Sequence, residues 1–381
     1  MQLQVRPAEA QAIAPQQLAF NALTGLRAIA AVWVIAYHYR SGVFSSLGAT
    51  HILPVLGFGY LGVDLFFILS GFVIYHVHGQ EMARPTIRIF LRFICLRAAR
   101  LYPVYLFTLA IFASMVWLIP AFGFEVVDPS HYPLQHLILS ILLVQTWGLT
   151  RNLTWNFPAW SVSAEWFCYL LFPLAAVIGT RLSRGAMMLG IILLLVTVTV
   201  VYLTSFNLTM NQAIGWRALV RATTEFSLGC LLRGLQHRVR TETWPWTGIT
   251  AGVAVVWAAS FYTPLPVGVV AIPLFATLVL AGSIRGNVIS LVLSWRPFVA
   301  IGAASYSLYL MQAPIEKGAA DLEQFLSPSR PVQSAGIVGI YVALLAIGTT
   351  LVHLLVENPS RRWLRSRIDT YMPVRRPEEP R

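Results

Sequence analysis

The feature that most constrains this chain is a series of apolar runs, each long enough to cross a lipid bilayer as a helix. A helix needs about 17–25 predominantly apolar residues for this. The runs cover residues 22–40, 58–78, 101–119, 160–180, 186–204, 214–234, 246–262, 266–284, 297–316 and 333–356. Because a backbone in lipid must satisfy its own hydrogen bonds, the sequence predicts an all-α, polytopic bundle of about ten spanning helices.

Composition also separates this chain from ordinary soluble domains. Only 11% of its residues are charged and 57% are hydrophobic, whereas soluble domains are about a quarter charged. The net charge of +12 comes from short basic clusters between the apolar runs. We therefore expect these clusters to contact membrane lipids and not nucleic acid. Three scattered cysteines have neither metal nor redox spacing, and no metal site is predicted.

The distribution of arginines predicts the orientation of the chain in the membrane. Arginines gather between the second and third runs and again in the C-terminal tail, and both regions should face the cytoplasm. A weaker run at 134–148 would place the later basic clusters outside if it crossed. We therefore expect that run to be re-entrant or to lie along the outer face. Both termini are then cytoplasmic, and the cell inner (plasma) membrane is the predicted location.

The domain organisation follows from the same runs. We expect an N-terminal cytoplasmic segment at 1–21, one membrane domain at 22–363 and a cytoplasmic tail at 364–381. The tail is rich in charge and proline towards its end, so it is predicted to be disordered.

Two ionisable residues in the first apolar run share one helix face. Ten residues separate Arg27 from His38, which places them about 20° apart around the helix and about 16–17 Å apart along it. Ionisable side chains in a spanning helix usually face a cavity or a substrate path. The structural alternative is a snorkelling arginine with an interfacial histidine.

Other polar residues in the apolar runs are candidates for the same path. Asp64 and Glu165 are expected at the depth of His38, where a carboxylate could orient a general base. Arg221 and Glu225 have the spacing of an intrahelical ion pair. The pair Ser70-Gly71 predicts a close helix contact. Arg97 and Arg100 favour either anionic lipid or the phosphates of a cytoplasmic cofactor.

These stretches together resemble the acyltransferase-3 family of integral membrane acyltransferases, which O-acetylate surface glycans and related molecules. The resemblance extends from about Leu23 to Trp363. It rests on "RAIAAVWVIAYH" at Arg27–His38, "GVDLFFILSGF" at Gly62–Phe72, "RAAR" at Arg97–Arg100, "WSVSAE" at Trp160–Glu165 and "SYSLYL" at Ser305–Leu310. One position departs from the family: Gln312 stands where a histidine is often found. Glutamine cannot act as a base, but it can bind an acceptor hydroxyl.

The resemblance implies an O-acetyltransferase that uses acetyl-CoA, with the donor phosphates at Arg27, Arg97 and Arg100. His38 would deprotonate a hydroxyl of a glycan or lipid-linked sugar, aided by Asp64 or Glu165. Substrate contacts are expected from Ser161, Ser163, Ser305, Tyr309 and Gln312. Two alternatives stay open. One is a transporter of an anionic solute, which predicts an inverted repeat that the sequence does not show. The other is a catalytically silent scaffold for glycan assembly.

Overall fold

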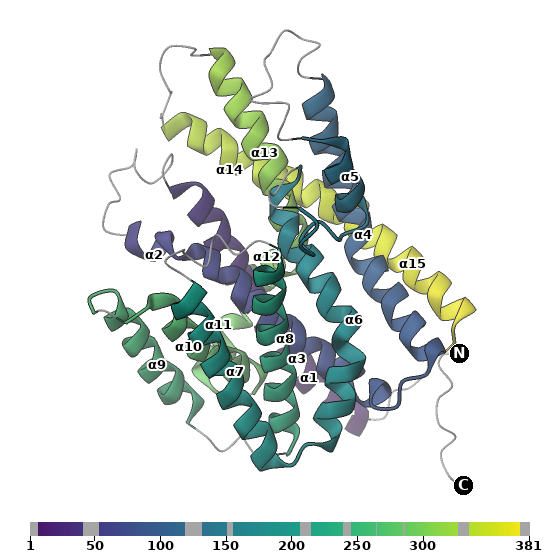
Figure 1. Cartoon of the computed structure of the whole chain (residues 1–381), viewed down its shortest axis with the longest axis vertical. Helices are drawn as coiled ribbons and strands as arrows, with labels where there is room; N and C mark the ends of the chain where they lie inside the picture. Colours follow the sequence, from purple (N-terminus) through teal and green to yellow (C-terminus); the bar gives the residue numbers. More distant parts are fainter. Residues whose placement is uncertain are drawn as a thin grey trace.

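The computed structural model is an all-α bundle, as the sequence predicts (Figure 1). The structure describes residues 7–40, 53–118, 132–150, 155–205, 215–238, 245–263, 265–284, 286–326 and 335–373. Within these ranges every regular element is helical. The membrane class and the fold class predicted from the apolar runs are therefore confirmed.

The helices follow the chain in the order of the apolar runs. The long ones are α1 (Pro7–His38), α3 (Gly62–Met82), α4 (Ile87–Leu118), α6 (Trp160–Arg181), α7 (Arg184–Ser205), α8 (Trp216–Arg238), α13 (Ser305–Leu326) and α14 (Ala335–Val352). The shorter ones are α2 (Leu53–Gly57), α5 (Leu134–Ile141), α9 (Trp246–Ser260), α10 (Val267–Ser283), α11 (Val288–Leu293), α12 (Arg296–Ala303) and α15 (Asn358–Tyr371). Two 3₁₀ turns, η3 (Gly59–Leu61) and η6 (Phe157–Ala159), and one π-helical turn, η9 (His353–Glu357), complete the set for the described residues.

Not every predicted span has the length of a full crossing. Four segments in the described ranges are long and apolar enough to cross a membrane, at Gly59–Met82, Ile87–Leu118, Phe157–Arg181 and Gly339–Tyr371. The predicted span 297–316 is bent by 62° between α12 and α13, and would be a fifth if it counts as one span. Helices α9 and α10 and the apolar part of α7 are shorter. These helices indicate a membrane protein, while ten crossings stay a prediction.

The weak run at 134–148 forms a short helix that does not span. Helix α5 has eight residues, which is about 12 Å at 1.5 Å per residue. The chain then turns onto the start of α6, where the Ser163 hydroxyl donates to the Leu143 carbonyl at 2.8 Å. In the same turn the Thr146 hydroxyl donates to the Trp160 carbonyl at 3.0 Å. The prediction of a short non-spanning helix is confirmed.

Helices α3 and α8 make a close backbone contact that bears on the site. A Cβ atom on Gly71 would lie 1.9 Å from the carbonyl oxygen of Phe226, and one on Gly229 would lie 2.1 Å from that of Ile68. Glycines at both contacts let the two backbones touch, as is common between membrane helices. The predicted close contact is therefore made by Gly71, while the hydroxyl of Ser70 donates a hydrogen bond to Glu165 on α6.

We expect Gly71→Ala to destabilise the bundle by about 1–3 kcal/mol or more, because the added methyl overlaps the Phe226 backbone. The measurement is the thermal unfolding midpoint of the purified protein in detergent. Gly252→Ala on α9 is the matched control, since no atom lies within 4 Å of its Cβ position. That control should be neutral or stabilising by up to about 1 kcal/mol through helix propensity. Equal midpoints for the two variants would contradict the backbone contact.

The C-terminal segment corrects the predicted disorder. Residues 364–371 belong to α15, which lies beside α4 (Figure 1). Arg92 donates to the Asp369 carboxylate at 2.6 Å and to the Met372 carbonyl at 3.0 Å. The arginine-rich first half of α4 thus provides partners that order the tail. Residues 374–381 and 1–6 lie outside the described residues, and α1 runs without a break through the predicted boundary at residue 22.

Candidate functional site

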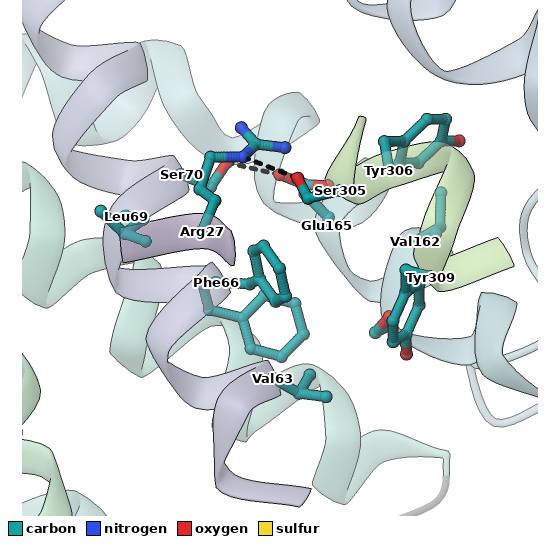
Figure 2. Close-up of a pocket in the computed structure, with 12 residues that line it drawn as sticks. Arg27, Val63, Phe66, Leu69, Ser70, Val162, Glu165, Ser305, Tyr306 and Tyr309 are labelled. Atoms are coloured by element: carbon teal, nitrogen blue, oxygen red, sulfur yellow. Dashed lines mark hydrogen bonds between the residues drawn. The ribbon is translucent and has the colours of Figure 1, made fainter. Parts of the chain in front are cut away.

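Helices α1, α3, α6 and α13 line a pocket with about 550 Å³ of empty space, which includes its opening to solvent. Figure 2 shows Arg27, Ser70, Glu165 and Ser305, one from each helix, gathered at one end of it. Apolar and aromatic side chains line the remainder: Val63, Phe66, Phe67, Leu69, Val162, Tyr306 and Tyr309. The pocket therefore combines a charged end with an apolar chamber.

Helical spacing explains pairs of lining residues on three of the four helices, while α1 contributes Arg27 alone. Residues four apart lie on one helix face. Ser161 and Glu165 on α6 follow this spacing, and so do the pairs Phe66 and Ser70 on α3 and Ser305 and Tyr309 on α13. Four of the five motifs that suggested the family thus place residues in the same pocket, and the motif at Arg97–Arg100 on α4 does not line it.

Hydrogen bonds fix the charged end of the pocket. Arg27 donates from Nε to the Ser305 hydroxyl at 3.3 Å. Its guanidinium carbon lies 5.8 Å from the centroid of the Phe66 ring, within cation–π range. On the other side, the Ser70 hydroxyl donates to the Glu165 carboxylate at 2.5 Å. Glu165 is also close enough to interact electrostatically with Arg27.

The structure brings the three predicted donor-site arginines into one electrostatic cluster. Arg27 interacts with Arg100, and Arg97 interacts with both Arg100 and Glu165. The guanidinium carbon of Arg100 lies 5.4 Å from the ring centroid of Tyr306, a pocket residue. Such a concentration of guanidinium groups suits a ligand that carries phosphates.

A buried carboxylate that the sequence analysis missed holds Arg100 in place. Glu357 forms an ion pair with Arg100 and accepts a hydrogen bond from the Ser307 hydroxyl at 2.6 Å. Its second oxygen also lies 2.9 Å from Nδ1 of His353. His353 and Glu357 bound the π-helical turn η9, an irregularity that often marks functional sites. The signal in the sequence was the i, i+4 pair of His353 and Glu357 at the end of the last apolar run.

Asp64 does not pair with His38, so the predicted partnership is wrong. Arg221 binds both Asp64 oxygens, donating from Nε at 2.7 Å and also from Nη2. Both side chains are buried, and Glu225 lies 3.9 Å from the Arg221 Nε. The reason is depth. A Cβ on Gly62 would lie 2.6 Å from the Ala30 carbonyl, so α3 begins about 12 Å below His38.

Glu165 does not pair with His38 either, because it lies at the Arg27 end of the pocket. The His38 ring packs against Tyr37 and Phe157, with centroids 5.2 and 5.4 Å apart. Within the described part of the chain, no carboxylate contacts His38. The turn η6, which contains Phe157, separates this histidine from the pocket-lining residues of α6.

The predicted substrate residues divide into three groups. Ser161 and Tyr309 line the pocket with their hydroxyls 2.8 Å apart, and Ser305 binds Arg27. Ser163 lies outside the pocket lining, because Leu143 and Thr146 occupy its hydroxyl. Its predicted substrate contact stays a prediction. Gln312 is fully buried one turn beyond Tyr309.

Comparison with known proteins decides the family. The profile of the acyltransferase-3 family, described as an acyltransferase domain, matches residues 20–356. This chain belongs to the acyltransferase-3 family. The pocket, the arginine cluster and His38 all lie inside the matched region. The expected activity class is therefore confirmed: the chain is a membrane acyltransferase.

Several curated members of the acyltransferase-3 family are similar to this chain. The acyltransferase MdmB of Streptomyces mycarofaciens is 26% identical, over 92% of this chain and 94% of its own length. The putative peptidoglycan O-acetyltransferase YrhL of Bacillus subtilis is 25% identical over 89% of this chain. The O-acetyltransferase OatA of Staphylococcus aureus is 25% identical over 77%. The matches span 54% of YrhL and 50% of OatA, about half of each. No solved structure matches this chain.

Proposed function

We propose that this chain transfers an acetyl group from cytoplasmic acetyl-CoA to a hydroxyl of a glycan or lipid-linked sugar on the outer side of the inner (plasma) membrane. The observation that carries the proposal is the pocket itself. It places Arg27 and Glu165 beside an apolar chamber in the interior of the bundle. Two relatives, YrhL and OatA, are named as O-acetyltransferases, which supports an acetyl group as the group transferred and a hydroxyl as its acceptor.

The arginine cluster is the proposed donor end of the site. Arg27, Arg97 and Arg100 would bind the phosphates of acetyl-CoA through charge-assisted hydrogen bonds. Within the described residues the Nε of Arg97 is buried and has no hydrogen-bond partner. It therefore has the capacity for such a bond. Glu357 would keep Arg100 oriented while leaving its remaining N–H groups for the ligand.

The chemistry of the proposed transfer follows from the two ends of α1. His38 accepts the proton of the acceptor hydroxyl, and the oxygen attacks the thioester carbonyl carbon. The tetrahedral oxyanion collapses with cleavage of the C–S bond, and the thiolate leaves and takes up a proton. Arg27, held by Ser305 about 16–17 Å from His38 along α1, would bind the donor at the other end of the path. Ser161 and Tyr309 would hold the reacting groups from the α6 and α13 sides.

The donor assignment predicts a selective effect on the acetyl-CoA requirement. Arg97→Ala should raise the KM for acetyl-CoA about ten- to hundredfold, because a lost charge-assisted bond costs about 1.5–3 kcal/mol. The measurement is CoA release by the purified protein in lipid nanodiscs. Arg97 gives a clearer test than Arg100, because replacing Arg100 would also leave the Glu357 carboxylate without its ion-pair partner. Arg88→Ala is the matched control, since Arg88 is exposed on the same helix. Equal KM values for the two variants would leave the cluster as a lipid anchor.

The proposed orientation has a direct test by cysteine labelling. Ser366→Cys on α15, in a chain whose Cys95, Cys168 and Cys230 are replaced by alanine, should react with an impermeant maleimide only after the cells are permeabilised. This follows from the arginines of that segment, which favour the cytoplasmic side. Labelling of intact cells would overturn the proposed orientation.

A further inference from the structure

One face of α13 carries a row of polar residues that continues beyond the pocket. Ser305 and Tyr309 line the pocket. Gln312 and Glu316 follow at helical spacing, so that all four residues lie within about 60° of one another around the axis. The Tyr39 hydroxyl, next to His38 on α1, donates to the Gln312 carbonyl at 3.4 Å. The row therefore leads from the Arg27 end of α1 to the His38 end.

The outer part of this row contains buried polar atoms without partners. Gln312 is fully buried, and neither its Nε2 nor its Oε1 has a hydrogen-bond partner among the described residues. Over the same part of the chain, Oε2 of Glu316 is buried and unpaired as well. Buried polar atoms without partners are rare because each forfeits its bonds to water. An unpaired amide and, one turn on, a carboxylate with one unpaired oxygen indicate groups kept for a ligand.

An aromatic pair lies beside these groups. The rings of Tyr39 and Tyr341 are 3.9 Å apart between centroids and tilted by 32°. Glu316 interacts with the Tyr39 side chain, so the carboxylate and the aromatic pair are neighbours. His38, the last residue of α1, immediately precedes Tyr39. The unpaired groups thus lie at the end of α1 that carries the proposed base.

We infer that Gln312, Glu316 and the pair Tyr39–Tyr341 bind the acceptor, and that the acceptor presents a polyhydroxylated ring such as a sugar. This inference rests on the proposed function. A glutamine amide offers one donor group and one acceptor atom, and a carboxylate accepts, which suits neighbouring hydroxyls that both donate and accept. Aromatic faces suit the apolar C–H face of a sugar ring. A glutamate at this position disfavours an anionic solute.

The test uses Gln312→Met and Glu316→Met in nanodiscs, with tetra-N-acetylchitotetraose as the probe sugar and acetyl-CoA as donor. Each variant should raise the KM for the sugar at least about tenfold, while acetyl-CoA cleavage in the absence of sugar stays at the wild-type rate. The thermal midpoint of Gln312→Met should be unchanged or higher, because an unpaired buried amide is replaced by an apolar side chain of similar size. A merely structural amide would instead lower the midpoint together with both activities.

Thr349→Val is the matched control. Its hydroxyl is also buried and unpaired within the described residues, but it belongs to α14 and not to the row on α13. This variant should keep the wild-type KM for the sugar. A fall in sugar use equal to that of Gln312→Met would overturn the site, because loss of any buried polar atom would then produce the effect.

A binding measurement separates this inference from the proposed function. Titration of wild type with the same sugar, followed by tryptophan fluorescence, should show binding that both methionine variants weaken. If the wild-type protein binds the sugar but cleaves no acetyl-CoA, the proposed function is wrong and the acceptor site still stands. Wild type that transfers acetyl while both variants keep its KM and affinity overturns the site. Wild type that neither binds nor acetylates the sugar overturns the assignment to a sugar ring.

Discussion

Replacing Asp64 by alanine is expected to leave little folded protein in the membrane. Asp64 binds Arg221 through two hydrogen bonds, and both side chains are buried. Removing one partner of a buried ion pair costs about 3–5 kcal/mol, because the other charge stays buried and unpaired. Whole domains are stable by only about 5–15 kcal/mol. The measurement is the amount of monodisperse protein after size-exclusion chromatography in detergent.

The control for this prediction is an exposed ion pair in the same protein. Asp369 pairs with Arg92 at 2.6 Å, but its side chain is 45% exposed, so Asp369→Ala should change the yield little. A second outcome would decide between structure and catalysis at Asp64. An Asp64→Ala protein that reaches wild-type yield yet transfers no acetyl group would contradict the structural assignment and return Asp64 to the catalytic residues.

Replacing His38 by alanine is expected to lower acetyl transfer by about 10²–10⁴-fold, the usual contribution of a general base. The yield and the KM for acetyl-CoA should change little. The reason is that His38 makes T-shaped ring contacts with Tyr37 and Phe157 and lies outside the lining of the Arg27 pocket. The measurement is sugar-dependent CoA release at saturating donor.

His136→Ala is the matched control for His38. His136 is half-buried on α5, the short helix predicted to lie on the outer side. Its replacement should leave transfer at the wild-type rate. If His38→Ala retained more than about a tenth of that rate, His38 would not be the base, and Glu316 would be the next side chain to test.

The fold class could be predicted from the sequence because it depends on local composition. A run such as 58–78 is too apolar for solvent, and only a helix satisfies its backbone in lipid. The shared face of Arg27 and His38 follows from helical periodicity alone. The prediction that residues 364–371 are disordered is wrong, because it was based on composition alone. Hydrogen bonds from Arg92 to this segment, which composition does not show, hold it in place.

The sequence analysis named several side chains that the structure places in the pocket, but it did not predict which partners hold them there. The sequence by itself determined the helical fold, the family motifs and the faces on which Arg27, Glu165 and Ser305 lie. Only the tertiary structure decided the partners: Asp64 with Arg221, Glu165 with Ser70 and Arg100 with Glu357. The physical reason is that periodicity fixes the angle of a residue around its own helix. Its depth relative to other helices depends on backbone contacts such as Gly62 on Ala30 and Gly71 on Phe226, between segments far apart in the chain.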